Sequence, residues 1–115
     1  MATEMPEALE YVRLHYGVTL DGETHVDVDL GPLSVADYFV LEPERKVVPE
    51  GDELSAYQYT LRVLSRRIRR LGSVPRGRIT GDFLREQLQM PDAMLLVERM
   101  GRLDRRLESF RDADG

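Results

Sequence analysis

Two stripes of apolar residues, spaced as in coiled-coil helices, constrain the fold of this chain most strongly. In residues 54–71, apolar side chains recur at intervals of three and four residues, at Leu54, Tyr57, Leu61, Leu64, Ile68 and Leu71. Residues 91–111 repeat these intervals at Ala93, Leu96, Met100, Leu103, Leu107 and Phe110. Such spacing places side chains on one face of a helix, so the sequence predicts long helices over 54–71 and 91–111. The two faces could pack together within one chain, across a homo-oligomer, or on a partner.

A different periodicity occupies residues 11–30. Apolar and polar residues alternate, with the apolar ones at even positions, which is typical of strands with one buried face. Turn residues separate the two alternating runs, so we expect a β-hairpin over 11–30. Because both apolar sets must share a face, a three-residue loop over 21–23 that pairs Leu20 with Thr24 is preferred to a two-residue Asp21-Gly22 turn.

Capping residues and prolines delimit the remaining elements. Ser34 is a good N-cap with Asp37 three residues later, and Pro43 follows, so a short helix is expected over 34–42. Residues 43–53 are predicted to form a loop. Thr80 is the candidate N-cap of a second short helix over 80–89, and Gly72 is the expected stop of the preceding long helix. The order is that of a single α+β domain over 1–115, with an N-terminal β-hairpin followed by about four helices, two long and two short.

Composition excludes several classes of protein. The chain has 115 residues and no cysteine, which excludes disulfides, thiol catalysis and cysteine-bound zinc. No apolar run approaches the ~18–20 residues of a membrane span, and the N-terminus lacks the apolar region of a secretory signal. Residues 1–53 carry a net charge of −10 and residues 54–115 one of +5. This asymmetry could steer a charged partner or hold the two halves together.

Few residues suggest chemistry at a site. The polar face of the hairpin carries His15, His25, Asp27 and Asp29, which are residue types that bind metals, but such residues are common on solvated strands without a metal. No nucleophile elbow or phosphate-binding loop is recognisable. We therefore expect a protein that is not an enzyme, with no catalytic residue, metal or cofactor.

The arginine cluster in LSRRIRRLG is the most unusual local feature of this acidic chain. Arg66, Arg67, Arg69 and Arg70 would lie on the helix face away from the apolar stripe. This basic stretch, 62–70, could contact nucleic-acid phosphates, although few aromatic residues accompany it. It could instead be a solvated face, offset the dipole at a helix C-terminus, or pair with the acidic half of the chain. We favour these readings, or contact with a protein partner, over nucleic acid.

The order of these pieces resembles the tail assembly chaperones of long-tailed, Mu-like and P2-like bacteriophages. The resemblance rests on a strand pair with a DG turn, VTLDGETHVDVDL, a helix start in LGPLSVADYF with Pro32 and Asp37, and a closing FLREQLQMPDAMLLVERMGRLDRRLESF. Within the last segment, the matching positions are Leu88, Pro91, Asp92, Leu95, Leu96 and the region of Leu103. The resemblance as a whole covers about residues 17–110 and rests on apolar positions together with proline and aspartate.

The resemblance implies a function in the cytoplasm of a bacterial host. The protein would bind the tape-measure protein, tail-tube subunits or both during tail assembly, without catalysis. Two apolar helix faces suit the binding of an amphipathic helix, and methionine adapts to varied partners. The expected partner-binding residues, all in the last helix, are Met94, Leu96, Met100, Leu103 and Leu107. Arg66, Arg67, Arg69 and Arg70 would form an electrostatic surface.

Overall fold

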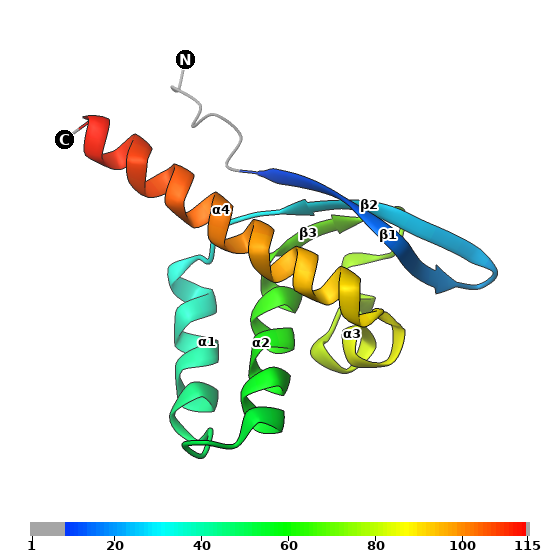
Figure 1. Ribbon diagram of the computed structural model, residues 1–115, viewed down its shortest axis with the longest axis horizontal. Coiled ribbons are helices and arrows are strands. Elements are labelled where there is room, and N and C mark those ends of the chain that lie inside the picture. The colour runs from blue at the N-terminus through cyan, green and yellow to red at the C-terminus, as the bar shows by residue number, and fades with distance from the viewer. Residues whose placement is uncertain (1–8, 115) are drawn as a thin grey trace.

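The computed structural model describes the backbone of residues 9–114 and the side chains of residues 9–109. The described chain is an α+β protein in which one antiparallel sheet packs against helices (Figure 1). The elements are β1 (Glu10–Leu20), β2 (Glu23–Leu30), α1 (Val35–Lys46), α2 (Glu53–Arg67), β3 (Ile68–Leu71), the 3-10 turn η1 (Arg76–Arg78), α3 (Gly81–Gln87) and α4 (Met90–Asp114). Helix α4 lies across the sheet, whereas α1 and α2 run side by side away from it.

The predicted hairpin is present, but its turn and register differ from the prediction. Leu20 pairs with Glu23, so the turn contains only Asp21 and Gly22. Both residues have positive φ, 53° and 80°, as a type I′ turn requires. The expected loop over 21–23 is therefore wrong.

A bulge in β1 explains why the register argument failed. Residues 10–13 pair with residues 30–27, and residues 18–20 pair with residues 25–23, so residues 14–17 all lie opposite Val26. Three additional residues in β1 change the pairing beyond the bulge, so that even-numbered residues of β1 there pair with odd-numbered residues of β2. His25, predicted on the polar face, consequently pairs with Val18 and is buried.

The first predicted long helix, 54–71, does not extend to residue 71, because α2 ends at Arg67 and the chain continues as β3. Ile68 pairs with Leu30 and Arg70 with Asp29, which leaves Arg69 as an additional residue in the strand. This bulge turns Ile68 and Leu71 towards the same buried face although they are three residues apart. A bulged strand thus carries the spacing of a helix, and the sequence pattern could not distinguish the two.

Helix α1 is longer than predicted and continues through Pro43 to Lys46. Ser34 caps it as expected, in a capping box with Asp37. Proline in a helix interior costs ~3 kcal/mol because one hydrogen bond is lost. Charge-assisted hydrogen bonds around the last turn offset this cost, from Arg45 to Glu42 at 2.9 Å and from Arg62 to Glu44 at 2.8 Å. The loop predicted over 43–53 is accordingly reduced to residues 47–52.

The core lies between the sheet and the helices. It contains residues from every strand and from α2, α3 and α4, including Val12, Val28, Leu64, Leu84 and Leu96. Helix α4 packs on β1, and α2 packs mainly on α3. The two predicted apolar faces therefore share one core but do not run along each other.

Candidate partner-binding surface

Helix α4 holds all five predicted partner-binding residues, and the structure divides them. Leu96 and Leu103 are fully buried against the sheet, so they belong to the core and cannot meet a partner in this conformation. Met100 and Leu107 are partly buried at the edge of that core. Met94 alone among the five is exposed, at 63% of its surface. The side chain of Phe110 lies outside the described residues.

A buried carboxylate fixes the start of α4 to the sheet. Asp92 has no exposed surface and accepts hydrogen bonds from the backbone N–H groups of His15, Tyr16 and Gly17, at 2.7, 3.0 and 3.0 Å. These are bulge residues of β1, whose N–H groups cannot all pair with β2. Gly17 has φ +82°, and a Cβ atom there would lie 2.7 Å from the His25 carbonyl oxygen. Asp92 and Gly17 together define this junction.

A second junction lies two turns further along α4. Glu10 is only 4% exposed and contacts three arginines of α4, Arg99 at 3.0 Å, Arg102 at 3.5 Å and Arg106 at 2.9 Å. Their spacing of three and four residues places all three guanidinium groups on one face of the helix. With the Asp92 junction, this cluster orients α4 and keeps its apolar face on the core.

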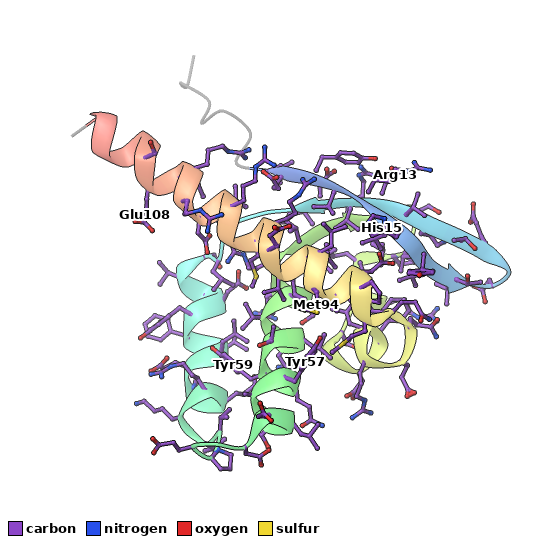
Figure 2. All side chains as sticks on the ribbon, in the orientation of Figure 1. Arg13, His15, Tyr57, Tyr59, Met94 and Glu108 are labelled. Carbon is purple, nitrogen blue, oxygen red and sulfur yellow. The ribbon has the colours of Figure 1, made fainter. Side chains whose placement is uncertain are left out.

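An apolar groove remains open where α2, α3 and the start of α4 meet. It has a volume of about 270 Å³, and its walls include Leu54, Tyr57, Leu88 and Met90. Leu54 is 79% exposed and Met90 55%, although both are large apolar residues. The Tyr57 hydroxyl donates to the Met90 sulfur at 2.9 Å. Met94, labelled in Figure 2, lies on α4 one turn beyond Met90 and is exposed, but it is not part of the groove wall.

The four arginines of the predicted electrostatic surface make contacts within the protein. Arg66 pairs with Asp37 at 3.0 Å and Arg70 with Asp29 at 2.7 Å. Arg67 is buried and donates to the Gly31 carbonyl oxygen and to Asp104. Arg69 donates to the Pro32 and Arg66 carbonyl oxygens. The pairs with Asp29 and Asp37 join the basic half to the acidic half, one of the readings favoured above.

The pKa of Asp37 reflects these contacts. Its partial burial acts to raise the pKa, but the hydrogen bonds from Ser34 and the charges of Arg66 and Arg69 outweigh that effect and lower it. Arg76 lies nearby, and its pKa is lowered by burial and by repulsion from Arg69 and Arg66. Asp37 is therefore ionised at neutral pH beside a crowded group of arginines.

The polar residues of the hairpin do not form a metal site within the part of the chain that the structure describes. Asp29 pairs with Tyr11 rather than lying opposite His15. Asp27 accepts a hydrogen bond from the Tyr11 hydroxyl, and this bond raises the pKa of Tyr11. The buried ring of His25 accepts a hydrogen bond from the Ser73 backbone at 3.3 Å. The four residues thus have separate roles.

Sequence reasoning overlooked Asp92 and Glu10 as structural residues. Asp92 directly follows Pro91 in the first turn of a helix, where an acid is explained by the helix dipole alone. Its three partners are at least 75 residues away, and no local pattern indicates them. The three arginines that contact Glu10 share one helix face, which was the available signal for an acidic partner.

Comparison with known proteins found no matching family model, no matching curated protein and no matching solved structure. Among the described helices, none combines the length and apolar character needed to cross a membrane.

Proposed function

We propose that this protein is a non-catalytic tail assembly chaperone that binds the tape-measure protein, tail-tube subunits or both. The observation that carries the proposal is the open apolar groove lined by Leu54, Tyr57 and Met90. Large exposed apolar residues that gather at one place are typical of surfaces that bind another protein. The sequence resemblance supplies the identity of the partner and the expected location, the cytoplasm of a bacterial host.

The groove suits one or two apolar side chains of an amphipathic helix. Helices bind such grooves through residues spaced by three or four positions. Methionine side chains adapt their shape to the residues that they contact, and Met90 lines the groove. Leu96 and Leu103, which the sequence suggested for this task, would instead keep the groove in place from the core side.

Co-expression with a phage tape-measure protein or tail-tube subunit tests the proposal. We expect the tape-measure protein to co-purify with the wild-type chain and to be lost from Leu54→Glu and Met90→Glu variants. Val47→Glu is the matched control, because Val47 is 76% exposed and lies away from the groove. If the wild type retains neither tape-measure protein nor tail-tube subunits, the proposal is wrong.

Nucleic-acid binding through residues 62–70 is the alternative, and the observed contacts favour it less. Arg62, Arg66, Arg67 and Arg70 all pair with carboxylates of the chain itself. Phosphate contacts would have to replace these pairs. Duplex DNA and RNA affinities at 50 and 200 mM salt would decide: tight binding that falls steeply with salt would support the alternative.

A further inference from the structure

Helix α1 carries an apolar face that its own fold leaves uncovered. Val35 is 73% exposed, Tyr38 55% and Phe39 70%, and Leu33 just before the helix is 38% exposed. The rings of Tyr38 and Phe39 pack edge to face with centroids 6.1 Å apart, so they form one apolar surface. Among the described elements, α1 packs substantially only on α2, on the side of α2 away from α3 (Figure 1). This surface is therefore separate from the groove described above.

Three arginines gather at the N-terminal end of this face. Arg69 donates to the Arg66 carbonyl oxygen at 2.5 Å, and Arg76 donates to the same oxygen at 3.4 Å. The guanidinium group of Arg66 contacts Asp37 at 3.0 Å. Among the described ion pairs, Asp37 is the only carboxylate that pairs with any of these three arginines. Three positive charges thus face one negative charge, which leaves an excess of two.

The excess charge and the apolar face are adjacent. Arg69 donates to the carbonyl oxygen of Pro32, next to Leu33, so its guanidinium group lies at the start of the apolar face. A ligand that covers the apolar face would therefore reach the arginines at one end. Carboxylates there would relieve the repulsion among the guanidinium groups, whereas basic side chains would increase it.

We propose that the outer face of α1, with Arg66, Arg69 and Arg76 at its N-terminal end, docks an amphipathic helix that carries acidic side chains at one end. Helix α1 is 12 residues long, or ~18 Å, which matches about three turns of a partner helix. The proposal rests on the proposed function only in that the docked helix would belong to the assembly client. Beyond the proposed function, the proposal assigns a second contact surface, on α1, and predicts that the partner helix is acidic at one end.

Two synthetic peptides of ~16 residues test the charge requirement. Both carry leucines on one helical face; one has glutamates in its first turn and the other has lysines there. Fluorescence polarisation with the full chain at 50 and 200 mM salt should show the glutamate peptide binding at least tenfold more tightly, with the difference shrinking at the higher salt. Equal binding of the two peptides, or no binding of the glutamate peptide, would overturn the proposal.

Variants locate the site. Phe39→Ser should weaken binding of the glutamate peptide about tenfold. Arg76→Gln should weaken it several-fold while it keeps a hydrogen-bond donor for Arg66. Arg105→Gln, on the exposed side of α4, is the matched control and should leave affinity unchanged. If Phe39→Ser binds as the wild type does, the apolar face of α1 is not the site.

Two further measurements separate this proposal from its competitors. If sedimentation shows a wild-type dimer that Phe39→Ser dissociates, a second copy of the chain covers α1 and the proposal is wrong. If the tape-measure protein co-purifies equally with wild type and Phe39→Ser, the docking surface is wrong but the proposed function stands. If the glutamate peptide binds as expected and no tail protein co-purifies, the surface stands and the tail-assembly function fails.

Discussion

Replacing Asp92 should reveal how much of the stability depends on the junction between α4 and the bulge of β1. Its carboxylate is fully buried and accepts three backbone hydrogen bonds, two at one oxygen and one at the other. Asp92→Ala leaves all three N–H groups without this acceptor. Asp92→Asn keeps one acceptor oxygen but places an NH₂ group where the other oxygen stood, so a donor then faces a donor.

Hydrogen bonds to a charged acceptor are each worth ~1.5–3 kcal/mol, but water can reach part-buried donors after the substitution. The N–H group of Gly17 is buried, whereas those of His15 and Tyr16 are only partly so. Relief from burying a charge offsets some of the loss. We therefore expect Asp92→Ala to lower the free energy of unfolding by ~3–5 kcal/mol and Asp92→Asn by ~1–2.5 kcal/mol.

Urea unfolding followed by circular dichroism measures both losses, provided that the slope with urea stays constant. Asp82→Ala is the matched control, because Asp82 also lies in the first turn of a helix but is 88% exposed at its side chain. It should change stability by less than ~0.5 kcal/mol, which isolates the buried hydrogen bonds from the helix-dipole effect. If Asp92→Ala is as mild as Asp82→Ala, the assigned role of the junction is wrong.

Four further substitutions test other parts of the fold. Gly17→Ala should lower the free energy of unfolding in urea by at least ~2 kcal/mol, because the added Cβ clashes with neighbouring atoms and φ is unfavourable for alanine. Gly22→Ala has a similar φ but open space around it, so it should lower the same free energy by only ~1 kcal/mol. Glu10→Gln should lower the free energy of unfolding by only ~1–2 kcal/mol, because water partly solvates the three arginine partners after the charge is removed. A thermal midpoint equal to that of the wild type would contradict this expectation. The hydrogen bond from Arg62 lowers the pKa of Glu44 below 4.5, so this carboxylate stabilises the fold above pH 4.5, and the contribution is lost as the pH falls through the lower, folded value. Arg62→Met should therefore make the stability less dependent on pH below 4.5. If the urea midpoint of this variant falls with decreasing pH as steeply as that of the wild type, the ion pair between Glu44 and Arg62 does not stabilise the fold.

Local signals in the sequence were sufficient for most elements. Ser34, Asp37 and Thr80 cap helices as predicted, because a cap depends only on residues three positions away. The α+β class also follows from the two periodicities. The extent of α1 could not be predicted, since the turn that contains Pro43 is held partly by the contact between Glu44 and Arg62, which lies in another helix.

The bulges were the main obstacle to prediction. In β3, the bulge at Arg69 gives Ile68 and Leu71 the spacing of a helix. In β1, the bulge changes the pairing from even with even residues to even with odd residues, so the predicted hairpin register fails. Both depend on contacts with distant residues. For the same reason, the predicted partner-binding set mixed the core residue Leu96 with the exposed Met94, because one helical stripe cannot reveal how far it is covered.

The contact between Asp92 and β1 also has a consequence for the order of events during synthesis. The two partners are 75 to 77 residues apart, so a growing chain exposes β1 long before Asp92 has been translated. Until then, the bulge has no acceptor for its N–H groups, and the hairpin is free to sample competing strand registers. The N-terminal strand would reach its final pairing only after the last helix has formed, so its lifetime in an incomplete state is set by translation of the distal half.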